Sequence, residues 1–203
     1  MLDLRVERLY FSRGALLVAG VDEVGRGPLA GPVVAAAVLV GPDSPIIEGV
    51  DDSKQLTRRR REQLAAAIVS GLPYAVGAAS TREIDRLNIR RATALAMRRA
   101  LRRLPQTPGA VLVDGLPVPE LGVEHEALVD GDARSYAIAC ASIVAKTVRD
   151  RLMRRLALRH PAYGWDVNVG YGTPKHRQAI EREGVTPHHR RSFTPVLQRE
   201  LPL

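Results

Sequence analysis

Several ordinary features are missing from this 203-residue chain, and each absence narrows what the protein can be. A single cysteine, Cys140, excludes a disulfide within the chain and suits a reducing compartment. Aromatic residues make up only 4% of the sequence, so the core must be built from Ala, Val, Leu and Ile. The longest apolar run, residues 32–40, is too short to span a bilayer, and the N-terminus lacks the pattern of a signal peptide. We therefore expect a cytoplasmic protein that does not cross a membrane.

Lysine is also scarce, although the chain is basic. The formal net charge is +8, and residues 149–200 carry 11 basic and five acidic side chains. This asymmetry indicates a polyanionic partner, and an arginine-rich, solvated surface would explain it equally well. Only three of the 30 basic residues are lysines, and a compact ammonium differs from the planar guanidinium in how it meets a phosphate. We therefore rank Lys54, Lys146 and Lys175 as candidate phosphate contacts.

Buried strands alternate with helices along the chain. Apolar runs predict strands over residues 16–22, 33–40, 74–79 and 110–114, and a short strand near 123–129. Helical spacing predicts helices over residues 58–70, about 80–105, 135–160 and 174–183, with Thr57, Ser80 and Thr173 in capping positions. With no repeat and no linker, this order predicts one layered α/β domain.

Acidic side chains stand where two of these strands end. Asp22 and Glu23 end the first strand, Asp114 ends the fourth, and Asp132 precedes the long helix. Clustered carboxylates repel one another unless a cation joins them, and oxygen ligands suit Mg²⁺ or Mn²⁺. Two such ions form the general device for in-line cleavage of a phosphodiester. Each acid alone is equally typical of a turn or a helix cap, so spacing leaves both interpretations open.

The segment Gly25–Arg26–Gly27 follows the first two acids. Adjacent strand residues point to opposite faces of a sheet, so Asp22 and Glu23 can share a site only if the strand ends or distorts there. The glycines permit such a break, and they let backbone atoms approach a ligand closely, as in reading a ribose 2′-hydroxyl. An ordinary tight turn would have the same composition.

An ordered series of motifs resembles bacterial ribonuclease HII. Residues 20–33 (GVDEVGRGPLAGPV) resemble its opening signature, and the resemblance continues through DSK at 52–54, VDG at 113–115 and GD at 131–132. It ends with ASIVAK at 141–146, YGW at 163–165, GYGT at 170–173 and HHRRSF at 188–193. The matches keep their order over almost the whole chain, and that makes the resemblance specific.

The resemblance implies a ribonuclease H-like α/β fold, with a mixed central sheet flanked by helices and a small helical C-terminal portion. Residues 1–160 would form the catalytic domain, and residues 161–203 would pack on it. It also implies an endoribonuclease that cuts the RNA strand of RNA–DNA hybrids and nicks 5′ of ribonucleotides embedded in duplex DNA. One or two Mn²⁺ or Mg²⁺ ions would be held by four catalytic carboxylates: Asp22, Glu23, Asp114 and Asp132.

The resemblance further implies which residues contact the substrate. Gly25, Arg26 and Gly27 would recognise the ribonucleotide 2′-hydroxyl, and Tyr171 would stack on the sugar at the DNA side of the junction. Backbone phosphates would be held by Lys54, Ser142 and Lys146. The substrates implied are RNA–DNA hybrids and ribonucleotide-containing DNA duplexes, and the protein is expected to be a monomer.

Two other functions are compatible with the same composition. A junction resolvase or transposase-like nuclease would share the fold and cut all-DNA branched substrates. A nucleic-acid-binding module without catalysis would use the basic surface and keep the acids for structure. The module predicts binding that neither Mg²⁺ nor an Asp→Asn change affects, so metal dependence separates it from the enzymes.

Overall fold

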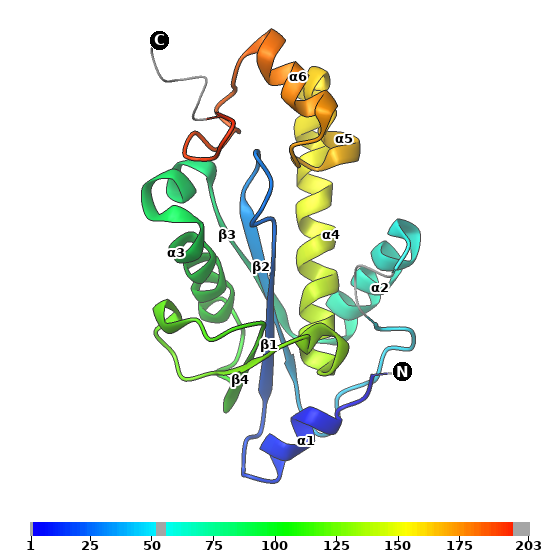
Figure 1. The fold of residues 1–203 in the computed structure, drawn as a ribbon. Helices are drawn as coiled ribbons and strands as arrows, with labels where there is room; N and C mark the ends of the chain where they lie inside the picture. Colours follow the sequence, from blue (N-terminus) through cyan, green and yellow to red (C-terminus); the bar gives the residue numbers. More distant parts are fainter. Residues whose placement is uncertain (1, 52–55, 197–203) are drawn as a thin grey trace.

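The fold is built on one mixed β-sheet with helices on both faces (Figure 1). The computed structural model describes residues 2–51 and 56–196. The strand order is β3-β2-β1-β4-β5; β1 pairs antiparallel with β2 and parallel with β4. The strands are β1 (Val18–Val24), β2 (Val33–Val40), β3 (Tyr74–Ala79), β4 (Ala110–Asp114) and β5 (Glu126–Leu128).

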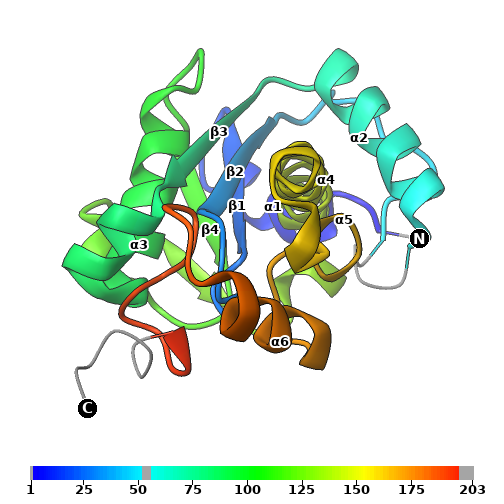
Figure 2. The same cartoon turned by 90° about the horizontal axis from the view of Figure 1, so that it is seen from above.

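The helices form layers on either side of this sheet. Seen from above, α3 covers one face and α4 the other, with α2 packed outside α4 (Figure 2). Within residues 2–51 and 56–196, no helix has both the length and the apolar character that a membrane crossing requires. The helices are α1 (Arg5–Phe11), α2 (Arg58–Gly71), α3 (Thr81–Arg102), α4 (Tyr136–Arg159), α5 (Trp165–Asn168) and α6 (Pro174–Glu183).

Helix α4 lies unusually close to strand β1 because of Gly20. A Cβ atom on Gly20 would lie 2.1 Å from the carbonyl carbon of Ala137 in the first turn of α4. No side chain larger than hydrogen fits this gap without moving one backbone away from the other. The contact therefore fixes the start of α4 against the middle of β1, two residues before Asp22.

The same end of α4 is capped from outside by α1. The buried carboxylate of Glu7 accepts hydrogen bonds from the Ser135 hydroxyl at 2.6 Å and the Ala137 amide at 2.9 Å. A negative charge is favourable there because the first amides of a helix have no partner within the helix and carry partial positive charge. Helix α1 thus ties the N-terminus of the chain to the helix that packs beneath the acidic residues.

A third apolar cluster joins the C-terminal segments to the rest of the fold. Its buried members include Met153 and Ala157 from the second half of α4, Trp165 from α5 and Ile180 from α6. Leu29, from the loop between β1 and β2, packs in the same cluster. The C-terminal helices are therefore seated on α4 and on the loop that follows the acidic pair (Figure 1).

Most of the predicted elements are confirmed, as is the mixed sheet with flanking helices and a small helical C-terminal portion. Strands 33–40, 74–79 and 110–114 have the predicted bounds, and the caps at Thr57, Ser80 and Thr173 are formed. The first strand was placed two residues too early. It begins at Val18 and continues to Val24, because all seven of its residues pair with β2 and Leu16 is exposed.

The helix predicted from about residue 80 to 105 is interrupted. Asn88 has φ 65° and ψ 166°, and its side-chain oxygen accepts a hydrogen bond from the Arg91 amide at 3.2 Å. Asn88 therefore caps a second helical segment within α3, in a backbone conformation that is costly for a residue other than glycine. Neither this break nor helices α1 and α5 are among the elements predicted from the sequence.

Replacing Gly20 tests the close approach of α4. We expect Gly20→Ala to destabilise the protein by about 3 kcal/mol or more, because the added methyl would overlap backbone rather than a movable side chain. Gly71→Ala is the matched control, since its nearest neighbour would be 3.9 Å away and the position is helical. The control should be neutral or slightly stabilising in urea unfolding. Equal midpoints for the two variants would contradict the proposed packing.

Acid should destabilise the C-terminal cluster through His189. Burial, with neighbouring His176, lowers the pKa of His189 to about 4. The unfolded chain then binds the proton first, so stability falls as pH drops from about 6.5 towards 4. The Glu83 carboxylate, with a pKa near 2 because of its bonds to Arg99, loses its contribution only at lower pH. Thermal melts at pH 7 and 4.5 should show a smaller loss for His189→Gln than for the unaltered chain.

Candidate functional site

Asp22 and Asp114 lie on the same face of the sheet, towards α4. In β1 the even-numbered residue Val18 packs in the core beneath α4, as does Leu112 in β4, so Asp22 and Asp114 share that face. Their strands are neighbours and run parallel, paired as far as Val21 and Val113. Ser142, on α4, hydrogen-bonds the Asp22 carboxylate with its hydroxyl. The helix thus orients one acid of the pair.

Glu23 points to the other face, as strand geometry requires, and reaches the site at an open edge. The pairing of β1 with β4 ends at Val21, whereas the pairing with β2 continues to Val24. After Val21, β1 therefore has a paired strand on one side only, β2. Glu23 lies close enough to the other two acids for their charges to interact: the charge of Glu23 raises the pKa of Asp22, and the charge of Asp114 raises the pKa of Glu23. The sequence suggested that β1 must end or distort for Asp22 and Glu23 to share a site. Instead β1 continues, and it is the neighbouring strand β4 that ends.

These carboxylates are held in an unfavourable electrostatic environment. Burial raises the pKa of Asp22 well above its usual value, and the charges of Glu23 and Asp114 raise it further. Burial also raises the pKa of Glu23, against the opposing effect of Arg26, whose guanidinium lies 3.1 Å from the Glu23 carboxylate. Like charges gathered in a buried place are typical of a site that binds a cation.

The fourth acid is brought in by the turn before α4. The amides of Gly131 and Asp132 lie 2.8 and 3.3 Å from Asp114 Oδ1, and Asp132 is buried. A Cβ atom on Gly131 would lie 3.1 Å from the same oxygen, so the turn is pressed against the end of β4. This contact places Asp132 directly beside Asp114.

The donor set fits a hard divalent cation in its chemistry. It consists of carboxylate oxygens, without cysteine or histidine, and such oxygens suit Mg²⁺ or Mn²⁺ rather than zinc. In the part of the chain that the structure describes, no three His, Cys, Asp or Glu side chains form a complete metal cage. Instead, Glu23 is turned to Arg26, and Asp114 to backbone amides. Binding a cation would therefore require these side chains to exchange partners.

The loop after Glu23 is fixed by Arg190, a residue that the sequence analysis left without a role. Arg190 is fully buried and donates to the carbonyls of Gly25, Arg26 and Gly31, at 2.7 Å for Arg26 and 3.0 Å for Gly31. Within the described residues no carboxylate lies at ion-pair distance from it. Its guanidinium therefore serves as a backbone clamp.

Arg149 clamps the same loop from α4. It too is fully buried, and it donates to the carbonyls of Ala30, Pro32 and Val169 at 3.0–3.2 Å. A Cβ atom on Gly25, where φ is +92°, would lie 2.1 Å from Arg149 Nε. Glycine is thus required at Gly25 twice over, by the backbone conformation and by the arginine behind it.

Tyr171 lies across from this loop. The residue is 46% exposed, and a Cβ atom on Gly27 would lie 3.7 Å from the Cε1 atom of its ring. Arg26 and Gly27 are exposed, so the structure brings together residues that the resemblance assigned to substrate recognition.

The remaining predicted contacts are placed less simply. Lys146 follows Ser142 by one helical turn and forms an ion pair of 2.9 Å with Asp150, which also pairs with Arg61 of α2 at 3.5 Å. In the structure Lys146 is therefore paired to a carboxylate. Lys54 lies outside the described residues. Lys175 is in α6, and no contact with the acidic cluster is recorded for it.

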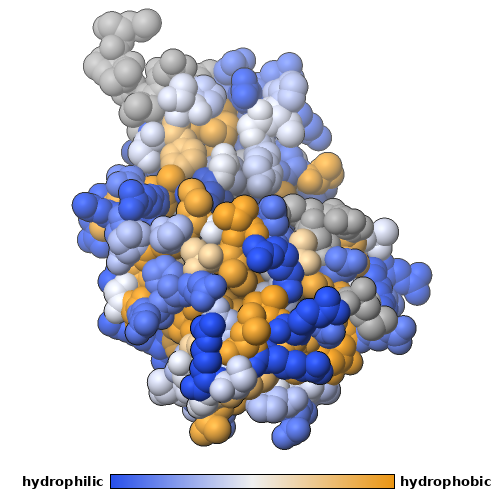
Figure 3. Space-filling view, turned by 60° about the horizontal axis from the view of Figure 1, so that its bottom comes forward, coloured by the Kyte–Doolittle hydropathy of each residue, from blue (hydrophilic) through white to orange (hydrophobic). Residues whose placement is uncertain are grey.

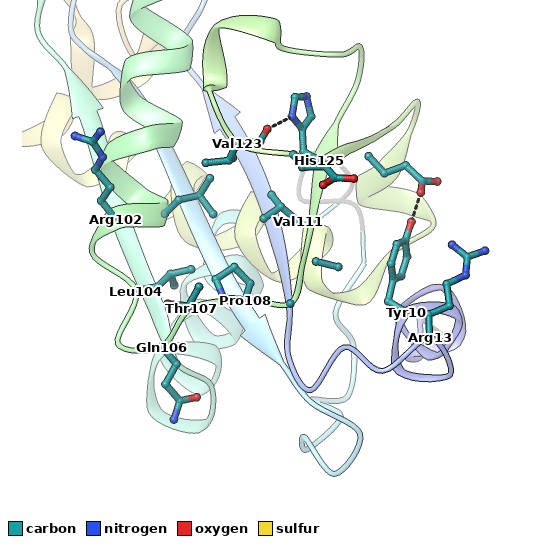
Figure 4. Close-up of a pocket in the computed structure, with 15 residues that line it drawn as sticks. Tyr10, Arg13, Arg102, Leu104, Gln106, Thr107, Pro108, Val111, Val123 and His125 are labelled. Atoms are coloured by element: carbon teal, nitrogen blue, oxygen red, sulfur yellow. Dashed lines mark hydrogen bonds between the residues drawn. The ribbon is translucent and has the colours of Figure 1, made fainter.

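A pocket lies at the opposite end of the sheet. It has a volume of about 820 Å³ and is lined by Tyr10, Arg102, Pro108 and Val111, among others, at the start of β4 rather than its end (Figure 4). On the face at the bottom of the molecule, hydrophobic side chains gather near the centre and are divided by hydrophilic ones (Figure 3). None of the acidic residues described above lines this pocket.

Comparison with known proteins yields one consistent family. A model of the family described as Ribonuclease HII matches residues 19–196. A protein of Paracoccus denitrificans named Ribonuclease HII is 56% identical over 195 residues, which cover 96% of this chain and 92% of that protein. A protein of the same name from Ruegeria pomeroyi is 53% identical and covers 96% and 83% of the two chains.

Solved structures give the same result for the fold. The crystal structure of ribonuclease H2 from Pyrococcus horikoshii superposes with a TM-score of 0.77 at 30% identity, covering 91% of this chain and 97% of that one. The structure of Bst-RNase HIII in complex with Mn²⁺ has a TM-score of 0.71 at 25% identity, and covers 91% and 69% of the two chains.

The charge at Asp22 should lower stability when no cation is bound. Because the folded protein raises the pKa of Asp22, the native state binds the proton more tightly, and stability falls as pH rises towards that pKa. We expect Asp22→Asn to raise Tm by a few degrees in EDTA at pH 7.5. The gain should shrink as pH is lowered.

Asp43→Asn, at an exposed position after β2, is the control and should leave Tm unchanged. A lower Tm for Asp22→Asn in EDTA would show instead that the carboxylate is a structural acceptor for Ser142 and the Glu23 amide.

Proposed function

The chain belongs to the ribonuclease HII family, and we propose that Asp22, Glu23, Asp114 and Asp132 form its catalytic centre. It is an endoribonuclease that hydrolyses the RNA strand of RNA–DNA hybrids and nicks 5′ of ribonucleotides embedded in DNA, leaving 5′-phosphate and 3′-hydroxyl ends. The observation that carries the proposal is the charge coupling of Asp22, Glu23 and Asp114 at the ends of neighbouring strands. The basic segment of residues 149–200 carries a net positive charge that suits a polyanion, although its Arg149 and Arg190 are buried.

The enzyme depends on a divalent metal ion, and we propose one or two Mn²⁺ or Mg²⁺ ions held by the four carboxylates. When bound, such ions supply Lewis-acid activation of water and neutralise charge that develops on the phosphate. Ser142 orients Asp22 by its hydrogen bond, and the amides of Gly131 and Asp132 orient Asp114. Arg26 screens Glu23 until a cation takes its place.

Substrate recognition is proposed for the loop and the ring that face each other. Gly25, Arg26 and Gly27 would read the 2′-hydroxyl through backbone atoms, which the buried arginines hold in place. Tyr171 would stack on the sugar of the DNA side. Phosphates would be held by Lys54, Ser142 and Lys146. Of these, Ser142 also orients the Asp22 carboxylate.

The larger arrangement is also part of this proposal. Residues 1–160 form the catalytic domain, and residues 161–203 pack on it and carry Tyr171. The substrates are RNA–DNA hybrids and DNA duplexes that contain ribonucleotides, and the enzyme acts as a monomer in the cytoplasm. The third apolar cluster supports the packing, since it joins α4, α5 and α6.

The activity is tested with a DNA duplex that carries one ribonucleotide. We expect cutting on its 5′ side in Mn²⁺ or Mg²⁺, none in EDTA, and none in an all-DNA duplex. Cleavage of a branched all-DNA junction would indicate a resolvase. Metal-independent binding without cutting would indicate a binding module.

The catalytic carboxylates are tested by isosteric amides. Asp114→Asn and Asp22→Asn should reduce kcat by at least 10²-fold while the protein stays folded, because electrostatic stabilisation supplies most of the catalysis. Asp43→Asn should retain full activity. Normal turnover by folded Asp114→Asn would exclude Asp114 from the centre.

A further inference from the structure

A buried chain of hydrogen-bonded side chains lies behind Tyr171. His176, in the first turn of α6, is fully buried, and its Nδ1 atom lies 2.9 Å from the Tyr171 carbonyl oxygen. Its Nε2 atom lies 3.0 Å from Trp165 Nε1 and 3.2 Å from His189 Nε2. The His189 Nδ1 atom in turn lies 2.9 Å from the Thr186 amide. Four segments of the C-terminal portion therefore meet at one imidazole.

The partners of His176 fix its protonation state. A carbonyl oxygen can only accept, so His176 Nδ1 carries the proton and donates it to Tyr171. An indole N–H can only donate, so His176 Nε2 accepts from Trp165. The Thr186 amide can only donate, so His189 Nδ1 accepts and His189 Nε2–H donates to His176. Every polar ring atom thus has a partner when both histidines are neutral, and Trp165 and His189 share the single lone pair of His176 Nε2. Burial lowers the pKa of each histidine below its ordinary value.

The glycines on either side of Tyr171 are held by neighbouring segments. The Leu29 amide donates to the Gly170 carbonyl at 2.8 Å, and Arg177 donates to the Gly172 carbonyl at 2.9 Å. The Tyr171 amide donates to the Asn168 carbonyl at 2.9 Å, and the Tyr171 carbonyl accepts from the Thr173 amide at 2.8 Å. Among the side chains of the described residues, only His176 forms a hydrogen bond to a backbone atom of Tyr171 itself.

We propose that His176, held by Trp165 and His189, is a positioning residue that sets the place of the Tyr171 ring opposite the Gly25–Gly27 loop. The proposal rests on the substrate contact proposed above for Tyr171. His176 does not touch the substrate, and it acts only through the tyrosine. It should therefore govern how well the junction is aligned, and not the chemistry at the carboxylates.

A double-mutant cycle tests this dependence. His176→Leu should lower kcat/KM on the single-ribonucleotide duplex roughly tenfold, a loss of about 1.4 kcal/mol in transition-state stabilisation. In a Tyr171→Ala background the same change should cost less than about twofold, because the residue through which it acts is already gone. An equal loss in both backgrounds would overturn the proposal and leave His176 as a purely structural residue.

Two further variants separate positioning from general destabilisation. Tyr163→Phe removes the 3.0 Å hydrogen bond from Tyr163 to the Gly184 carbonyl in the same cluster, without touching Tyr171, and should leave kcat/KM unchanged. If His176→Leu does not fold, His176→Asn and His176→Gln replace it. Asparagine places an amide donor near the Nδ1 position and should keep most of the activity, whereas glutamine should not. Equal activity of the two at equal Tm would overturn the proposal.

The same assays distinguish this inference from the proposed function. Failure of the unaltered chain to cut the ribonucleotide duplex would refute the function itself. Cutting that Tyr171→Ala leaves intact would preserve the function and refute the role of the ring, and with it that of His176.

Discussion

The site depends on two buried guanidinium groups that bind backbone carbonyls instead of carboxylates. Arg149 and Arg190 together donate hydrogen bonds to the carbonyls of residues 25, 26, 30, 31, 32 and 169. Burying such charges is unfavourable: burial and the neighbouring Arg149 lower the pKa of Arg190 to about 9. In return, a loop without regular secondary structure is held at both ends, from α4 and from the C-terminal segment.

This clamp explains why the acids can stay close together without a cation. The loop fixes Arg26 beside Glu23, Ser142 is held by α4 beside Asp22, and the turn at Gly131 is fixed beside Asp114. Each carboxylate thus has one partner of its own that lessens the repulsion. The position of the acids is set by the fold, and in the proposed metal site the charge that these partners leave uncompensated would attract a cation.

Much of this could be predicted from the sequence, because the signals were local. Apolar runs of eight and six residues ended at glycines, prolines or caps, and they gave β2 and β3 to the residue. The four acids were proposed as site residues because they follow strands or precede a helix. What could not be predicted depends on contacts distant in sequence. Arg149 and Arg190 look like solvated arginines in a basic segment, and only the fold shows that they are buried. Likewise, Glu23 reaches the site because β4 stops short of β1, a relation between strands about ninety residues apart.

Helix α4 is one uninterrupted rod from Tyr136 to Arg159, and it carries Ser142 at the acids, Arg149 at the loop and Met153 in the C-terminal cluster. Segments that are attached to one continuous helix cannot open and close relative to one another as separate domains do. The Arg149 bond to Val169 further ties the Tyr171 turn to that rod. The relative positions of the acids, the loop and the Tyr171 turn are therefore fixed, and a bound duplex would have to bend to fit them. Sequence steps around the ribonucleotide that bend easily should then be favoured over stiff ones.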